Sequence, residues 1–128
     1  MKVVFINCKE QPFLDRILSE SKLYETRTRN TLGKLIGDRV LLAETGHGKP
    51  LVRCAATIDR IIAVYSRDEW DKYYSKYADV DSGSRYDWHD DTKVKYLYLL
   101  TDIQPVEPFC PQLGRYHGRV WAEYEEEV

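Results

Sequence analysis

The chain has 128 residues and a net charge of −2, with 43% hydrophobic and 12% aromatic residues. This length predicts a single domain over residues 1–128, and the composition is typical of a globular protein. No apolar run approaches the ~20 residues that a membrane span needs, and the N-terminus does not resemble a secretory signal. Three cysteines at wide spacings favour reduced thiols, so we expect a cytoplasmic protein.

The average charge hides a gradient along the chain. Lys22–Arg53 contains seven bases and three acids, a local charge of +4, whereas Thr101–Val128 contains two bases and six acids, a local charge of −4. We expect the basic side of such a polarised surface to hold an anionic ligand. The acidic tail Glu123–Glu127 is interpreted as a solvated chain end.

The N-terminal part predicts a strand followed by a helix. Lys2–Asn7 is a short apolar run rich in β-branched and aromatic residues, which is typical of a buried strand. Pro12 suits the first turn of a helix, and apolar residues then repeat at helical spacing through about Ser21. These apolar residues are Phe13, Leu14, Ile17 and Leu18.

A dense turn signal separates the next two predicted strands. Thr45–Pro50 is rich in turn residues and lies between Arg39–Ala43 and Leu51–Val64. This pattern predicts an antiparallel hairpin. Its second arm is long, and we expect that arm to bend near Asp59.

The clearest helix signal begins at Ser66. Ser66 and Glu69 have the spacing of a capping box, in which the Ser oxygen accepts a hydrogen bond from the Glu amide. Aromatic residues follow at i, i+3, i+4 and i+7, which predicts a stripe that faces the core. The stripe consists of Trp70, Tyr73, Tyr74 and Tyr77.

The C-terminal part predicts a loop, two strands and an extended crossing. Asp79–Asp91 is rich in Asp, Ser and Gly and indicates a loop. Val94–Leu99 alternates in a manner typical of a strand buried on both faces. Prolines at every third position in Pro105–Pro111 favour an extended crossing segment, and Val120–Tyr124 closes the chain as a strand.

This order of elements favours an α+β fold over a doubly wound one. Hairpins replace repeated βαβ units, so we expect a small curved antiparallel β-barrel with two or three packed helices.

A group of charged residues follows the first predicted helix. Lys22 lies at its C-terminus, where the helix dipole favours an ammonium. In an extended chain Glu25 and Arg27 point to one face, and Lys22 can turn toward Glu25. In a cleft, such a group can hold a nucleobase edge or a phosphate. On an open surface it is a ladder of ion pairs worth ~1 kcal/mol or less.

The same residues carry a family resemblance. Lys22-x-x-Glu25-x-Arg27 after a short helix, and Gly37–Val40 opening a hairpin, resemble the ASCH domain (activating signal cointegrator homology) of the PUA-like superfamily. The segments Tyr96–Asp102, Ile103–Pro108 and Gly118–Trp121 are similar to the C-terminal pattern of that family.

The resemblance implies a small β-barrel with a cleft lined by the Lys-x-x-Glu-x-Arg segment. Family members bind RNA, nucleotides or modified nucleosides; some are amidohydrolases on acylated cytidine, and some are nucleases. The amidohydrolase branch has a Thr where this chain has Glu25, and Thr26 is displaced to the opposite face of a strand. The Gly that usually begins the family motif is Glu20 here.

Trp88 is a second candidate because it lies in a polar loop, beside Tyr86, where periodicity does not demand burial. Nucleobases stack on such rings. Covering a cleft and plugging the barrel end are both open interpretations. The three histidines lack ligand spacing, so we predict no metal site and no cofactor.

We therefore predict a domain that binds RNA, or a modified nucleoside or nucleotide, in a cleft. Its carboxylate would read a base edge, its cations would hold phosphate or carbonyl oxygens, and Lys34 and Lys49 would extend the basic face. The predicted ligand contacts are Lys22, Glu25, Arg27, Arg29 and Trp88.

Two alternatives stay open. One is a small hydrolase, an amidohydrolase or ribonuclease, with Glu25 as a general base and Lys22 stabilising an oxyanion. The other is a protein-interaction module that uses the acidic C-terminus and the Pro-rich segment. The sequence indicates no oligomeric state.

Overall fold

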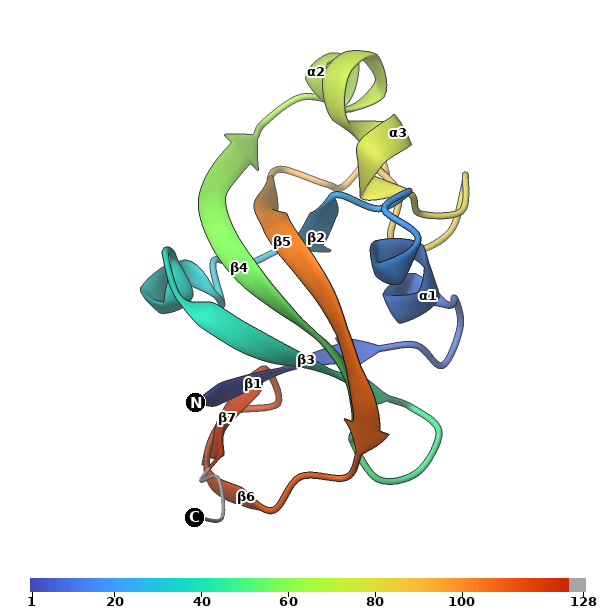
Figure 1. Ribbon diagram of the computed structural model, residues 1–128. Coiled ribbons are helices and arrows are strands. Elements are labelled where there is room, and N and C mark those ends of the chain that lie inside the picture. Colours follow the sequence, from blue (N-terminus) through green and yellow to red (C-terminus); the bar gives the residue numbers. More distant parts are fainter. Residues whose placement is uncertain (125–128) are drawn as a thin grey trace.

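A single seven-stranded sheet forms the body of the molecule (Figure 1). The computed structural model describes residues 1–124. The strands are β1 (Lys2–Asn7), β2 (Tyr24–Arg27), β3 (Arg39–Thr45), β4 (Leu51–Val64), β5 (Lys95–Phe109), β6 (Leu113–His117) and β7 (Trp121–Tyr124). Their order in the sheet is β2-β5-β4-β3-β1-β7-β6, and the long strands β4 and β5 curve together through the molecule.

The helical elements are short and lie at three places along the chain. They are α1 (Phe13–Leu18), the 3₁₀ turn η1 (Gly33–Leu35), and one continuous segment of α2 (Arg67–Glu69), the π-helical η2 (Trp70–Tyr74) and α3 (Ser75–Ala78). None of the helices within residues 1–124 is long and apolar enough to cross a membrane.

The sheet is mixed, so the expectation of a wholly antiparallel sheet is wrong. β1 and β3 run parallel, with Val3 opposite Leu41, whereas the other neighbouring strands are antiparallel. Parallel neighbours need a crossover of a dozen or more residues, which α1, β2 and η1 provide here. The α+β class is confirmed. The closed barrel is not, because β2 and β6 are the open edges of the sheet in residues 1–124.

The predicted hairpin is formed by β3 and β4. The register between β4 and β5 shifts between Ile58 and Arg60, which leaves Asp59 as an extra residue. Such a bulge bends a strand, and it confirms the expected bend. In the hairpin turn Gly46 has φ +99°, and a Cβ there would lie 2.8 Å from the Lys9 nitrogen. The turn therefore requires glycine at this position.

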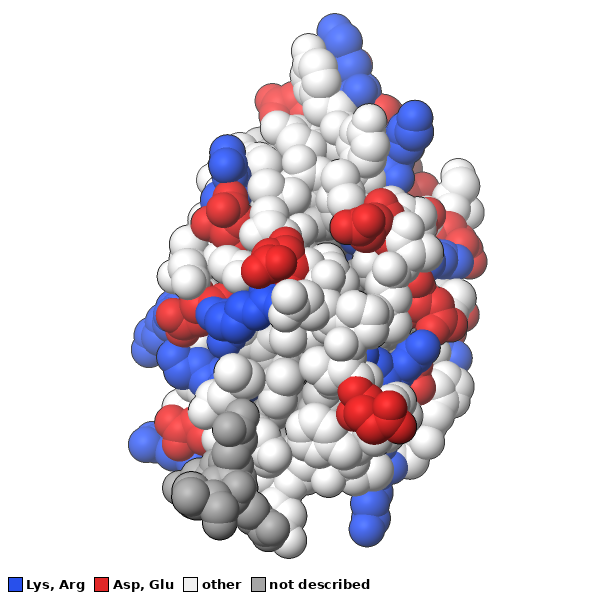
Figure 2. All heavy atoms as spheres, viewed as in Figure 1, with Lys and Arg blue, Asp and Glu red and all other residues white. Residues whose placement is uncertain are grey.

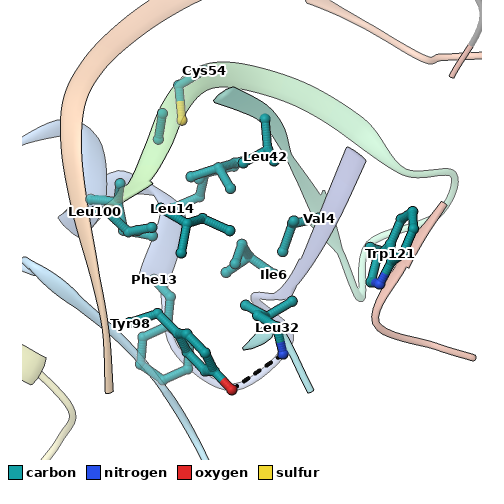
Figure 3. Packing of buried hydrophobic residues seen from close by; sticks show 14 of the residues in the cluster. Val4, Ile6, Phe13, Leu14, Leu32, Leu42, Cys54, Tyr98, Leu100 and Trp121 are labelled. Carbon is teal, nitrogen blue, oxygen red and sulfur yellow. Dashed lines mark hydrogen bonds between the residues drawn. The ribbon is translucent and has the colours of Figure 1, made fainter. Parts of the chain in front are cut away.

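The largest hydrophobic cluster lies between the sheet and α1 (Figure 3). The apolar face of α1 is buried as its spacing predicts, although the helix ends at Leu18 and not near Ser21. Tyr98 of β5 joins the cluster, and its hydroxyl accepts a hydrogen bond from the Leu32 amide at 3.2 Å. It donates in turn to Asn30 Oδ1 at 2.8 Å. The polar end of this buried ring is thus satisfied.

The aromatic stripe after Ser66 does not face the core along its whole length. Ser66 Oγ accepts from the Glu69 amide at 3.2 Å, as the capping pattern predicts. Trp70 is fully buried, but Tyr73 is 57% exposed and Tyr77 is 44% exposed. The π-helical turn at Trp70–Tyr74 rotates the following residues away from the 3.6-residue periodicity. The predicted stripe is therefore only partly buried: the half-buried Tyr74 packs against the cluster that contains Trp70, whereas Tyr73 and Tyr77 are exposed.

The Pro-rich segment belongs to β5 and is not a separate crossing. Pro105 lies opposite Cys54, and the strand continues past Pro108 to Phe109. β2 pairs with β5 only up to Leu99, so one side of the later half of β5 is a sheet edge. A proline is tolerated at such an edge because its missing N–H would have had no partner strand to bond to. The short strand β6 that follows was not predicted.

Glu20 adopts the left-handed conformation, with φ +63°. It follows α1, and its amide donates to the Ile17 carbonyl at 3.0 Å while the Lys22 amide donates to the Arg16 carbonyl at 3.0 Å. Glycine is favoured at this position of a helix end because it has no Cβ to clash. The departure from the family pattern at Glu20 therefore introduces backbone strain.

We expect Glu20→Gly to raise the free energy of unfolding by about 1 kcal/mol, because the strain of a left-handed residue is removed. Ser19→Gly is the matched control, since Ser19 has φ −79° and gains nothing from glycine. Denaturant melts of both variants test this. A loss of stability in both would contradict the strain at Glu20.

Candidate nucleotide-binding site

Of the charged motif, Lys22 precedes β2, and Glu25 and Arg27 belong to it. Within residues 1–124, β2 is an edge strand that pairs only with β5. Glu25 lies opposite Tyr98, and the Leu100 amide donates to the Leu23 carbonyl at 3.0 Å. Hydrogen bonding alternates along an antiparallel ladder, so the N–H and C=O of Thr26 turn toward the free edge. Glu25 and Arg27 share one face of the strand, as expected, and their side chains approach to 3.9 Å.

A cavity of about 460 Å³ opens beside β2. Its walls come from β1, α1 and β2, the turn between β3 and β4, the loop before β5, and the segment from β6 to β7. The volume lies within the range of about 300–1,000 Å³ that is typical of small-molecule sites. Glu25 and Arg27 both line this cavity, so the structure brings these two predicted residues together.

Glu25 is buried, with 7% of its surface exposed. Its Oε1 accepts a hydrogen bond from the Thr26 amide at 3.0 Å. Its Oε2 is buried and has no hydrogen-bond partner among the described residues. A buried carboxylate oxygen without a donor is unfavourable, and in a native protein such a group requires an explanation. The residue that carries this oxygen lines the cavity.

Arg27 links β2 to β1, which β5, β4 and β3 separate from it in the sheet. Its Nη2 donates to the Phe5 carbonyl of β1 at 2.9 Å. Its Nε lies 3.9 Å from Glu25 Oε1, beyond hydrogen-bonding distance. A guanidinium has five N–H donors in a planar fork, so donors remain for a ligand beside the acceptor on Glu25.

Aromatic rings form two further parts of the wall. Phe5 and Tyr116 are stacked, with centroids 6.0 Å apart and planes 26° from parallel. Phe13 and Tyr86 meet edge to face, with centroids 4.9 Å apart. The sequence did not single out Phe5, Phe13 or Tyr116, because they lie far apart in the chain. Phe5 and Phe13 are buried, whereas Tyr116 is 58% exposed and Tyr86 is half-buried, so the two tyrosine rings offer surface on which a planar ligand can stack.

A buried lysine holds Tyr86 in place. Lys95 Nζ donates to the Tyr86 carbonyl at 2.8 Å and lies 5.0 Å from the centroid of the Trp70 ring. Burial lowers the pKa of Lys95, and the nearby Asp87 carboxylate opposes that shift. This hydrogen bond therefore fixes the loop that carries Tyr86 to β5.

Two more arginines lie at the cavity, and neither was predicted as a site residue. Arg85 contacts Glu10 at 3.2 Å, and its side chain is 63% exposed. Arg119, between β6 and β7, is exposed and also lines the cavity. With Arg27 they supply three cations around one carboxylate, which favours a ligand that carries both donors and negative charge.

Lys22 is placed differently from our expectation. It is 2% exposed and does not line the cavity. Its Nζ donates to the Ala78 carbonyl at 2.5 Å and lies 4.8 Å from the centroid of the Phe13 ring. Burial lowers the pKa of Lys22 to about 8, although Glu25 and Asp79 oppose the shift. Its contact is therefore to the end of α3, and a role at the ligand stays a prediction.

The lowered pKa of Lys22 predicts a pH dependence of stability. Between its folded pKa of about 8 and its ordinary value of 10.5, the unfolded chain holds a proton that the folded chain lacks. The free energy of unfolding therefore rises with pH in this window, and the unfavourable burial of the charge is relieved.

We expect the wild type to gain about 2 kcal/mol relative to Lys22→Met between about pH 7 and about pH 9.5. Denaturant melts of both proteins across this range give the difference in their free energies of unfolding. The contributions of other titrating groups cancel in this difference. A difference that stays constant with pH would contradict the burial of a charged Lys22.

The remaining predicted contacts lie outside the cavity wall. Trp88 is buried beside Trp70 and Leu97 in a separate small cluster, which agrees better with a plug than with a cover over a cleft. Arg29 is exposed and does not line the cavity. The structure does not bring Trp88 or Arg29 to Glu25, and their predicted ligand contacts remain untested.

The local positive charge between Lys22 and Arg53 does not form one basic face. Lys22 is buried, Arg39 pairs with Asp102 at 3.4 Å, and Arg53 pairs with Asp15 at 2.7 Å. On the face shown in Figure 2, Lys and Arg side chains are interspersed with Asp and Glu. Counting charges along the chain missed this because the acidic partners come from other segments. Of the acidic tail, Glu125–Glu127 lie outside the described residues.

Comparison with solved structures identifies similar folds in ASCH proteins of Zymomonas mobilis. A Ser-to-Ala mutant of ZmASCH matches with a TM-score of 0.67 and 25% identity, over 84% of this chain and 72% of that chain. A Tyr-to-Phe mutant matches with a TM-score of 0.67 and 24% identity, over 84% and 73%. ASCH from the same organism gives 0.64 and 22%, over 84% and 71%.

No family model matches the chain, and no curated protein matches it. The structural matches nevertheless cover 84% of this chain. The predicted resemblance is therefore confirmed at the level of the fold, and the chain has an ASCH-like fold.

Proposed function

We propose that this ASCH-like domain binds a nucleotide, free or as part of RNA, in the cavity at the free edge of β2. The single observation that carries the proposal is the buried Oε2 of Glu25, which has no partner among the described residues and belongs to a residue on the cavity wall. A nucleobase supplies N–H donors to such an oxygen.

The rest of the wall suits the other parts of a nucleotide. Tyr86 and Tyr116 offer rings for a base to stack on, an interaction worth about 1–3 kcal/mol per base. Arg85 and Arg119 are exposed at the cavity and suit a phosphate, because a guanidinium matches its oxygens in pairs. Base recognition and phosphate binding are thus divided between buried and exposed residues.

The geometry favours binding over the hydrolase alternative. That scheme pairs Lys22 with Glu25, but the Lys22 ammonium is bound to the Ala78 carbonyl and does not line the cavity. For the protein-interaction alternative, the prolines of the Pro-rich segment are held within and just after β5. No contact of the described residues favours either alternative.

Titration of short single-stranded RNA and of the four nucleoside monophosphates tests the proposal. If about two phosphates are contacted, RNA affinity should fall about sevenfold between about 50 mM and about 200 mM salt. Arg119→Ala should weaken binding, whereas Arg115→Ala is a matched control because Arg115 is exposed but does not line the cavity. The absence of binding of every ligand at low salt would overturn the proposal.

A further inference from the structure

Resting on the proposed function, we infer that the ligand is single-stranded RNA, which continues from the cavity across the edge strand β2 onto a second contact surface. This surface, the tyrosine track, combines exposed and half-buried rings with two exposed ammonium groups. It consists of Tyr24, Tyr73, Tyr74 and Tyr77 with Lys72 and Lys76. None of these residues lines the cavity, so the track binds the nucleotides that flank the one in the cavity.

The rings of the track lie outside the core and contact one another. The π-helical turn at Trp70–Tyr74 leaves Tyr73 exposed, although regular helical spacing would place it beside the buried Trp70. The ring centroids of Tyr73 and Tyr74 are 6.2 Å apart, and those of Tyr74 and Tyr24 are 6.0 Å apart. Single exposed aromatic residues are ordinary, whereas contiguous rings are the kind of patch that marks an interaction site. π-helical turns are also frequent at functional sites.

The track adjoins the cavity across one strand. Tyr24 directly precedes Glu25 on β2, so its side chain lies on the opposite face of the strand from the cavity. β2 is an open edge of the sheet in residues 1–124, so only the edge of this strand separates the two faces. The Leu23 amide donates to the Tyr77 carbonyl at 2.7 Å, which fixes α3 beside the start of β2 (Figure 1). An RNA chain that leaves the cavity over Glu25 therefore meets Tyr24 first and then the rings of η2.

The cations of the track lie beside its rings. Lys72 Nζ lies 5.3 Å from the centroid of the Tyr73 ring, and Lys76 Nζ lies 5.7 Å from that of the Tyr77 ring. Neither ammonium forms an ion pair with a described residue. The acidic residues of α2, η2 and α3 precede both lysines in the chain, and they are Asp68, Glu69 and Asp71. The positive charge therefore lies in the half of the helical segment that contacts β2.

Rings beside free ammonium groups favour a single-stranded nucleic acid over a protein partner. Bases of every identity stack on aromatic rings, and ammonium groups bind the phosphates that link them. A protein helix that docks on such a face needs a hydrophobic groove. No aliphatic side chain is among the exposed residues of η2 and α3, which are Asp71, Lys72, Tyr73, Lys76 and Tyr77. A duplex does not suit the track either, because its bases are already stacked on one another.

Titration of the wild type with oligouridylates of increasing length, from uridine monophosphate to about eight nucleotides, tests the inference. Each base that stacks on a ring raises the affinity by about 5- to 150-fold. We expect an oligomer of about six nucleotides to bind at least about 30-fold tighter than uridine monophosphate. That gain exceeds the purely statistical advantage of offering several nucleotides to one cavity. A stable RNA duplex should show no such gain.

Variants of the track separate its contribution from that of the cavity. Tyr73→Ala should weaken the oligomer by at least about fivefold and leave uridine monophosphate unchanged, because only the oligomer reaches the track. Tyr65→Ala is the matched control, since Tyr65 is 68% exposed but contacts no other ring among the described residues. Lys76→Ala should make the slope of log affinity against log salt shallower by about 0.7, the value for one phosphate of a single strand. Arg115→Ala removes an exposed cation on β6 and should leave that slope unchanged.

The outcomes distinguish this inference from the proposed function. If neither uridine monophosphate nor the oligomers bind, both fail. If the monophosphate binds and the oligomers gain only the statistical advantage, nucleotide binding stands and the tyrosine track is overturned as an RNA surface. Equal losses in Tyr73→Ala and Tyr65→Ala would overturn it in the same way and favour a protein partner for the exposed rings. If Tyr73→Ala weakens the oligomer and Arg27→Met does not, the track binds RNA apart from the cavity, and the continuous path is overturned.

Discussion

Trp70→Ala should lower the free energy of unfolding by about 4 kcal/mol, within the range for deletion of a buried aromatic side chain. The Trp70 ring is fully buried between α2–α3 and β5, beside Trp88 and Leu97. Its Nε1 donates to Asp87 Oδ1 at 2.8 Å, so the substitution also removes a hydrogen bond that holds the loop before β5. Denaturant melts measure the loss.

Tyr73→Ala is the matched control, and we expect it to cost less than about 0.5 kcal/mol. Both aromatic residues belong to the same predicted stripe, but Tyr73 is 57% exposed. The contrast between the two variants therefore tests the π-helical turn. Equal losses in both variants would favour the regular helix that the spacing predicts and contradict the observed one.

Arg27→Met should lower nucleotide affinity by at least about tenfold, the loss expected when one charged hydrogen bond to the ligand is removed. It should also lower the free energy of unfolding by about 2 kcal/mol, since a charged hydrogen bond is lost and a buried carboxylate is left without its nearest cation. The lost bond is the one from Arg27 Nη2 to the Phe5 carbonyl, which joins β2 to β1.

A titration and a denaturant melt of each protein measure these two effects. Arg115→Met controls for the removal of one positive charge, because Arg115 is exposed and does not line the cavity, and we expect it to change neither quantity substantially. Unchanged stability and affinity in Arg27→Met would support the alternative first considered for the charged motif, a surface ladder of ion pairs.

Local patterns predicted much of the fold. A short apolar run located β1, helical spacing located α1, and turn residues located the hairpin of β3 and β4. The bend near Asp59, where the structure has a bulge, was expected from the length of the second arm. These features depend on residues that are close in sequence, so the sequence alone contains enough information to place them.

The features that were missed depend on distant contacts or on one displaced residue. Nothing local indicates that β1 pairs in parallel with β3, because the pairing forms across α1 and β2. The π-helical turn changes the face presented by Tyr73 through a single extra residue per turn. β2 pairs only with the segment of β5 from Tyr96 to Leu99. The prolines of β5 lie beyond this segment, where one side of the strand is a free edge, and this is why they are compatible with a strand.

The site was predicted in part, for the same reason. Strand periodicity placed Glu25 and Arg27 on one face, and both line the cavity. Lys22 was misplaced because its partner, the Ala78 carbonyl, lies 56 residues later in the chain. The rings of Phe5 and Tyr116 escaped notice because only the sheet brings β1 and β6 near β2.

The most direct test of a nucleotide site at the edge of β2 is a nuclear magnetic resonance titration of isotope-labelled protein with each of the four nucleoside monophosphates. The largest shifts are expected at the Thr26 amide, which is bonded to Glu25, and at Arg27, Tyr86 and Gly118 on the cavity wall. Amides elsewhere, such as that of Asp59 in the β4 bulge, should stay in place. Saturable shifts confined to other surfaces, or no shift at millimolar ligand, would contradict a nucleotide site at the edge of β2.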